Sequence, residues 1–252
     1  MPDSEFVFES GEPISVGSHG QDDYVYHAGN AVPNSGDSAL VFESGVGFGS
    51  AIIDDFEDGD VAEWRRLAGY SGDDTFNAST NRAFNGAYSG RCRNTGSGST
   101  PRFASFPGDG LPRYPTRNDT VEFWLNFDNQ SRGQIKPQIV LDPNSGALIR
   151  IAWDSYNSTY EITCKNQDGS IAGETIVSEN VGNYVDTWVR HRVEMEEGGT
   201  AIATVFDTSG TQINQISATM PDFPSGELGF GVHAQGHSDV DSSGYYDDLR
   251  IV

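Results

Sequence analysis

The chain has 252 residues, and its 37 acids and 15 bases give a formal net charge of −22 at pH 7. A surface this acidic repels a phosphate backbone, so we expect no binding to nucleic acid. No stretch approaches the roughly 18 consecutive apolar residues of a membrane span, so we also expect no membrane insertion.

The kinds of charged residue indicate the environment in which the protein works. The acids are 23 Asp and 14 Glu, and only two of the bases are Lys. Abundant Asp and scarce Lys favour adaptation to high salt, where self-repulsion is screened and hydrated carboxylates keep proteins apart. An ordinary acidic extracellular domain is the alternative. The start, Met1–Phe6, lacks the basic and apolar regions of a signal peptide, so we expect the protein to be made in the cytoplasm.

Residues 1–52 are predicted to form a small β-rich module. The segment Val7–Gly11 returns identically as Val41–Gly45, and each copy ends an alternating apolar run. Tyr24–His27 is a further strand candidate. Three or four short strands bury little apolar surface, so we expect the module to need a partner and to serve in docking or oligomerisation. Packing on the following domain is the alternative.

Residues 53–252 are predicted to form an all-β domain. Short alternating apolar runs recur at roughly ten-residue spacing between turn residues, and no window shows the 3.6-residue period of a helix. This pattern indicates a two-sheet sandwich or jelly roll. The predicted strands are Ile53–Phe56, Phe76–Ala78, Ala87–Arg93, Arg102–Phe106, Thr120–Phe127, Gln138–Leu141, Leu148–Trp153, Tyr160–Lys165, Thr187–Glu196, Ala201–Asp207, Asn214–Thr219, Glu227–Ala234 and Gly244–Val252.

The strand Thr120–Phe127 alternates most regularly. Val121 and Phe123 are predicted to face one way, and Glu122 and Trp124 the other. Because Trp124 and Trp188 lie inside long strands, we expect both of them to be core residues.

Short motifs along residues 53–252 occur in a recognisable order. They are Asp55–Gly59, Gly86–Arg91, Val121–Leu125, Asp186–Arg190, Val205–Asp207, Gly226–Gly231 and Tyr245–Ile251. Their order resembles the concanavalin A-like lectin/glucanase group, close to laminin-G-like and jelly-roll carbohydrate-binding families. The resemblance implies a concanavalin A-like β-sandwich. Residues 1–52 separately resemble structural proteins of haloarchaeal tailed viruses.

The resemblance also implies a metal, because this group often holds a structural Ca²⁺ between its first and last strands. If those strands pair here, Glu57 and Asp58 come near Asp247 and Asp248. Carboxylates this close repel one another unless a cation or protons neutralise them, and Ca²⁺ takes oxygen ligands. We therefore predict that these four residues hold Ca²⁺. The alternative is that they are solvated without an ion.

A ligand-contacting loop is predicted at Trp153–Asn157, where a strand passes into a loop. Exposed aromatic rings stack on the apolar faces of sugars, and polar neighbours bind the hydroxyl groups. Trp153, Asp154 and Tyr156 are therefore the predicted ligand-binding residues. The alternative is that these aromatic rings pack beneath loops.

Enzymatic activity is not expected. Glucanases of the resembled fold carry their catalytic carboxylates on one strand as Glu-x-Asp-x-x-Glu. The nearest match, Glu194–Glu197, lacks the Asp and the third Glu. The sequence leaves open whether Cys92 and Cys164 form a disulfide.

Together these patterns predict a virion structural protein, such as a spike, turret or fibre, of a halophilic archaeal virus. We expect a homo-oligomer in which residues 1–52 contact other virion proteins and the sandwich binds a host-surface glycan or glycoprotein. One alternative is a cellular carbohydrate-binding module or cryptic glycan hydrolase of a halophile. Another is a capsid decoration protein without a ligand.

Overall fold

A computed structural model of the protein divides the chain into two compact units, Met1–Ser50 and Ala51–Val252. The described residues form strands, turns and bends, and none of them belongs to a helix long and apolar enough to cross a membrane. The all-β prediction is confirmed. The structure describes residues 5–6, 14–15, 25–26, 29–33, 40–43, 51–67, 75–94, 102–128, 133–135, 138–142, 147–154, 158–182, 184–223, 225–236 and 242–252.

The described residues of the Met1–Ser50 unit form two small sheets. Its strands are β1 (Glu5–Phe6), β2 (Ile14–Ser15), β3 (Val25–Tyr26), β4 (Gly29–Pro33) and β5 (Leu40–Glu43). β1 and β2 pair antiparallel, and β5 lies between β3, which is parallel to it, and β4, which is antiparallel. The second copy of the repeat, Val41–Gly45, begins in β5, whereas the first copy, Val7–Gly11, lies outside the described residues.

The Ala51–Val252 unit is a sandwich of two eight-stranded sheets, which we name the β11 sheet and the β14 sheet after a central strand of each. The β11 sheet contains β6 (Ala51–Asp54), β8 (Thr75–Ser79), β9 (Ser89–Asn94), β11 (Thr120–Phe127), β17 (Trp188–Glu196), β18 (Thr200–Phe206), β19 (Gln212–Thr219) and β21 (Ser242–Ile251). Its order is β19-β18-β17-β11-β21-β9-β8, and β6 also pairs with β21.

The β14 sheet forms the second layer, with the order β16-β15-β14-β12-β20-β10-β7 and with β13 between β14 and β20. Every strand pair of both sheets is antiparallel. The strands are β7 (Arg65–Arg66), β10 (Arg102–Ser105), β12 (Gly133–Ile135), β13 (Gln138–Leu141), β14 (Leu148–Asp154), β15 (Thr159–Lys165), β16 (Ile176–Ser178) and β20 (Gly229–Gly236).

The hydrophobic core lies between the two sheets, and strand alternation decides which side chains enter it. Val121, Phe123 and Leu125 of β11 are buried there, as are Ile149 and Ile151 of β14. Burying one such side chain fully stabilises the fold by about 1.5–3 kcal/mol. The sandwich predicted from the alternation is therefore confirmed.

Each sheet also contributes a thiol to this core. Cys92 in β9 and Cys164 in β15 are buried and free, so the structure contains no disulfide between them. Burial raises the pKa of the Cys164 thiol to about 12, which makes it unreactive at neutral pH.

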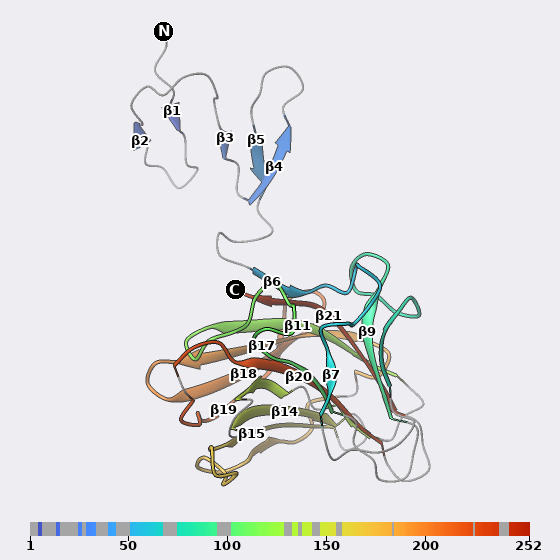
Figure 1. The fold of residues 1–252 in the computed structure, drawn as a ribbon, viewed down its shortest axis with the longest axis vertical. Coiled ribbons are helices and arrows are strands. Elements are labelled where there is room, and N and C mark those ends of the chain that lie inside the picture. Colours follow the sequence, from blue (N-terminus) through green and yellow to red (C-terminus); the bar gives the residue numbers. More distant parts are fainter. Residues whose placement is uncertain are drawn as a thin grey trace. The chain divides into compact units, whose positions relative to one another are not determined.

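The two end strands of the sandwich lie side by side, which meets the condition on which the predicted calcium site depended (Figure 1). β6 pairs antiparallel with β21, so that Ala51 is opposite Ile251 and Asp54 is opposite Leu249. This pairing brings the Asp55–Gly59 segment to the end of the sheet that also carries Asp247.

Candidate functional site

Glu57 and Asp247 are both held by one loop, the turn that precedes β9. The Asp247 carboxylate accepts hydrogen bonds from the backbone N–H groups of Phe84 (2.6 Å) and Asn85 (3.1 Å). The Glu57 carboxylate accepts from the N–H groups of Ala87 (2.9 Å) and Tyr88 (2.8 Å). The two predicted ligands thus fix the shape of this loop.

Gly86 allows the loop to approach so closely. Its φ of +65° lies in the left-handed region, which suits glycine. A Cβ atom at this position would lie 2.3 Å from the carboxyl carbon of Glu57. Any side chain here would push Glu57 away from the backbone N–H groups that it accepts from.

Asp248 lies near the same group. Burial raises the pKa of its carboxyl, the nearby Arg250 lowers it, and the charges of Asp55 and Glu57 raise it. Burial likewise raises the pKa of the neighbouring Asp247 to about 6, against the lowering effect of its backbone hydrogen bonds. The structure therefore brings Glu57, Asp247 and Asp248 to one end of the β11 sheet.

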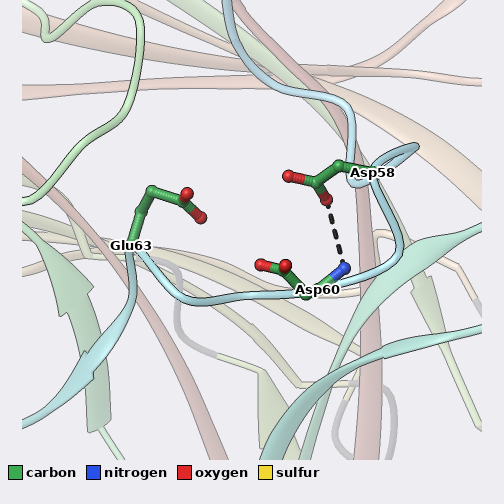
Figure 2. A group of neighbouring side chains, drawn as sticks. All are labelled: Asp58, Asp60 and Glu63. Atoms are coloured by element: carbon green, nitrogen blue, oxygen red, sulfur yellow. Dashed lines mark hydrogen bonds between the residues drawn. The ribbon is translucent and has the colours of Figure 1, made fainter.

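Asp58 turns away to a different group (Figure 2). Asp58, Asp60 and Glu63 bring one carboxylate oxygen each within 4.8 Å of one another, and Asp58 also accepts a hydrogen bond from the Asp60 N–H at 3.1 Å. Asp58 and Asp60 are exposed and Glu63 is half-buried. Hard carboxylate oxygens are ligands that suit Ca²⁺, although three of them supply at most half of the six to eight that it takes.

Asp54 lies beside this second group, in a groove of about 250 Å³ that Asp58 and Glu63 also line. Its carboxylate accepts hydrogen bonds from the Trp64 indole N–H (2.6 Å) and the Phe56 N–H (2.8 Å). Burial nevertheless raises the pKa of Asp54 to about 7, with Asp58 and Glu63 contributing in the same direction. A cation in the groove would favour the ionised form.

No three of the four predicted calcium ligands converge within the same distance in the part of the chain that the structure describes. Glu57, Asp247 and Asp248 lie near the loop before β9, whereas Asp58 joins Asp60 and Glu63. The calcium site stays a prediction, and Asp60 and Glu63 are carboxylates that the sequence reasoning missed. Their Asp-x-Asp-x-x-Glu spacing from Asp58 could have suggested them.

The predicted ligand-binding residues are separated by the alternation of β14. Trp153 points inward and is 1% exposed, with its ring against Tyr160 and His191. Its ring is therefore unavailable for stacking on a sugar, which corrects the expectation that it is open to solvent. Asp154 is also buried but lies on the outer face, and Tyr156 lies outside the described residues.

The outer face of the β14 sheet carries a polar network whose members mostly satisfy one another. Arg150 reaches Glu161 (3.2 Å) and Thr163 (3.3 Å), and Thr163 bonds Glu161 (2.8 Å) and Thr175 (3.2 Å). Thr163 is 1% exposed, so only part of this face meets solvent.

The outer face of the β11 sheet is more open and carries aromatic rings. Phe84 stacks on Trp124, with 3.7 Å between ring centroids, and meets Trp188 edge-on at 5.9 Å. Phe84 is 37% exposed and Trp188 is half-buried. Trp124 is buried, as expected, but it lies beneath Phe84 and not in the cluster between the sheets. Trp188 is only half-buried, so the expectation that it is a core residue is wrong.

Polar groups surround this aromatic cluster. The Arg82 guanidinium donates to the side-chain oxygen of Asn126 at 2.9 Å and pairs with Asp186. Asn126 lies opposite Trp188 in the register of β11 and β17. An exposed ring, a half-buried indole and an ion pair therefore meet on one open surface.

No protein-family model and no curated protein sequence matches the chain. Several solved structures have a similar fold. A β-glucanase of Bacillus licheniformis has a TM-score of 0.55 and 11% identity, covering 82% of this chain and 99% of its own. The carbohydrate-binding module CBM66 of Bacillus subtilis has a TM-score of 0.50 and 13% identity, covering 76% and 96%. An endo-β-1,4-glucuronan lyase of the fungus Trichoderma reesei has a TM-score of 0.51 and 14% identity, covering 75% and 93%.

The protein contains a concanavalin A-like jelly roll. At these identities the likeness establishes the fold alone, because one fold of this kind carries both enzymes and binding modules. The resemblance of residues 1–52 to haloarchaeal virus proteins stays a prediction.

The closest match to the glucanase signature, Glu194–Glu197, lies at the end of β17. Glu194 is half-buried, and Glu196 is exposed and precedes the turn at Gly199. Because neighbours of this fold include a glucanase and a lyase, the expectation that this protein is not an enzyme stays a prediction.

Proposed function

We propose that the concanavalin A-like unit is a carbohydrate-binding domain and that its ligand stacks on Phe84 and Trp188. The exposed Phe84 ring carries this proposal. Its stacking on Trp124 and the two hydrogen bonds that Asp247 accepts from Phe84 and Asn85 hold it in place. A ring that is already fixed loses little conformational entropy when a sugar binds, so stacking gives more net affinity.

The polar surroundings support the same ligand class. Sugars present apolar C–H faces and a rim of hydroxyl groups, so their sites combine aromatic rings with a few placed polar groups. Here Arg82, Asp186 and Asn126 lie beside the rings. The carbohydrate-binding module of similar fold adds support at the level of fold alone.

Affinity electrophoresis of the full chain through gels containing different polysaccharides tests the proposal. We expect Phe84→Leu, which keeps an apolar side chain but removes the ring, to weaken glycan binding by about fivefold to tenfold, or roughly 1–1.4 kcal/mol. Val177→Ala is the matched control, because Val177 is an exposed apolar residue of the β14 sheet. Equal binding by both variants and the original chain would rule out this surface as the site.

Two further variants separate the position of the site from its function. If Glu161→Gln loses binding while Phe84→Leu binds normally, the ligand binds on the outer face of the β14 sheet instead. Release of reducing ends or unsaturated sugars from any polysaccharide would show that the domain is an enzyme and not only a binding module.

We also propose the setting of this domain: an oligomeric virion component of a halophilic archaeal virus, with the Met1–Ser50 unit as its docking module. The support is the repeated Val-Phe-Glu-Ser-Gly segment and the acidic, Lys-poor composition. In such an assembly, multivalency would raise weak sugar affinities by about 10²–10⁴. The native mass of the full chain in molar salt tests this, and a monomer would favour a free-standing carbohydrate-binding module.

A further inference from the structure

Three arginines surround one buried carboxylate on the outer face of the β11 sheet. Glu122 is 2% exposed, and the strand register places it directly between Arg192 of β17 and Arg250 of β21. Arg192 Nε donates to Glu122 Oε1 at 2.8 Å, and Arg250 Nη2 donates to Oε2 at 3.2 Å. Arg190 Nη1 lies 3.7 Å from the same Oε1.

The donors in this cluster outnumber the acceptor. Each guanidinium has five N–H groups, whereas one carboxylate has about four lone-pair positions. The Nε atoms of Arg190 and Arg250 are buried and have no hydrogen-bond partner among the described residues. A single partner would be enough to neutralise Glu122, and the Arg192 side chain is 38% exposed, so its guanidinium keeps accessible donors for an additional oxyanion.

The remaining charges near the cluster lie to its sides. Asp248 interacts with Arg250, so the β21 side is compensated. Glu194 lies two residues beyond Arg192 on the same face of β17, and it forms no ion pair with the arginines among the described residues. The excess positive charge therefore lies on the β17 side, at Arg190 and Arg192.

Two contacts orient this positive side. The Arg190 guanidinium lies 4.6 Å from the centroid of the Phe206 ring, a cation–π contact that holds it against the sheet. The Arg192 side chain keeps 38% of its surface exposed. Across the sheet, Arg192 of β17 lies opposite Thr204 of β18, and Thr204 lies opposite Gln215 of β19, so that the three residues form a row.

Gln215 adds a neutral polar group to the same row. Its side-chain amide donates to the Thr204 hydroxyl at 3.0 Å, which fixes its direction, and Gln215 itself is exposed. The row thus offers guanidinium groups for an acid and an amide oxygen for a hydroxyl group.

Along β17, the arginines continue the aromatic surface that begins at Trp188. Trp188, Arg190 and Arg192 occupy alternate positions of β17, so all three lie on the outer face and span about 13 Å at roughly 3.3 Å per residue. A saccharide stacked on Trp188 therefore meets the arginines next.

We propose that Arg190 and Arg192 bind the carboxylate of an acidic sugar, with Gln215 accepting from a ring hydroxyl, so that the domain prefers uronic-acid glycans. The inference rests on the proposed function, because it takes the ligand to be a saccharide on this face. Planar guanidinium groups match carboxylates in two-point contacts, which an ammonium group cannot form.

Calorimetric titration of the full chain with oligogalacturonate, and with a neutral oligosaccharide of equal length, tests the preference. We expect Arg192→Gln to weaken oligogalacturonate binding by about tenfold and to leave neutral binding unchanged. Arg192→Lys should lose most of the preference while keeping the charge. Gln215→Ala, which leaves the Glu122 cluster intact, should weaken acidic binding by about threefold. Arg150→Gln, on the other sheet, is the matched control.

The outcomes separate the two proposals. Equal affinity for both ligands, or acidic binding that survives Arg192→Gln and Gln215→Ala, would overturn the preference and leave a neutral glycan site standing. Dextran sulfate bound as tightly as oligogalacturonate and independently of Arg192 would also overturn it, because it would show charge attraction alone. If neither saccharide binds the original chain, both proposals fall.

Discussion

The two outer faces of the sandwich use similar charged residues in different ways. On the β14 sheet, Arg150 and Glu161 pair with about a fifth of each side chain exposed, and Thr163 bonds both of them. On the β11 sheet, Glu122 is nearly inaccessible, and three guanidinium groups share its two oxygens. The first arrangement has one guanidinium for one carboxylate, whereas the second has three guanidinium groups for one carboxylate and so an excess of positive charge. A surface with surplus, oriented donors is the better starting point for binding an anion.

Removing each carboxylate in turn gives the largest expected contrast. Glu122→Gln leaves three guanidinium groups around a neutral amide, and breaking a buried ion pair in this way costs about 3–5 kcal/mol. Glu161→Gln breaks a partly exposed pair, for which about 0–1 kcal/mol is expected. Urea unfolding of both variants measures the difference. Equal losses would show that the two faces do not differ in this respect.

The second test uses pH, because β6 of the β11 sheet carries a half-buried acid, Asp54. With the pKa of Asp54 raised from 3.8 to about 7, the folded state binds a proton that the unfolded state releases. The resulting stability is fully present below pH 3.8 and is lost as the pH rises through about 7.

The Asp54→Asn variant isolates this contribution. We expect the unfolding free energy of the original chain, relative to this variant, to fall by about 2–3 kcal/mol between pH 5 and pH 8. His191 does not disturb the comparison: burial lowers its pKa to about 3, but both proteins contain it. A difference that does not change with pH would mean that Asp54 ionises normally.

Calcium removal should have the smallest effect, and it concerns the same end of the β11 sheet. If the predicted Ca²⁺ binds there, a chelator at fixed ionic strength should lower the unfolding temperature by several degrees, because the ion binds only the folded state. Glu63→Gln and Glu57→Gln then distinguish the two carboxylate groups, since only the group that holds the ion makes its variant insensitive to chelation. An unchanged unfolding temperature would contradict the calcium prediction.

Local pattern was sufficient to predict the sandwich. The alternation of Thr120–Phe127 predicted that Val121 and Phe123 share one face, and both lie in the core. The sequence left open whether the first and last strands pair, and only the structure shows that they do.

The side-chain clusters could not be predicted in this way. Glu122 meets Arg192 and Arg250 across 70 and 128 residues of sequence, and only the register of three strands brings them together. Trp153 was misplaced for a related reason. Alternation along Leu148–Asp154 makes Trp153 an inward residue, but its position next to a loop suggested exposure.

The pairing of Ala51 with Ile251 has a consequence for how this sandwich can be combined with other proteins. The first and last strands are hydrogen-bonded neighbours, so the unit enters and leaves its fold at points about 5 Å apart. A domain with adjacent entry and exit points can be inserted into a surface loop of another protein with short linkers. Joining the two points would equally permit new ends elsewhere, for example in the turn at Gly210, and so a circularly permuted domain whose outer faces are unchanged.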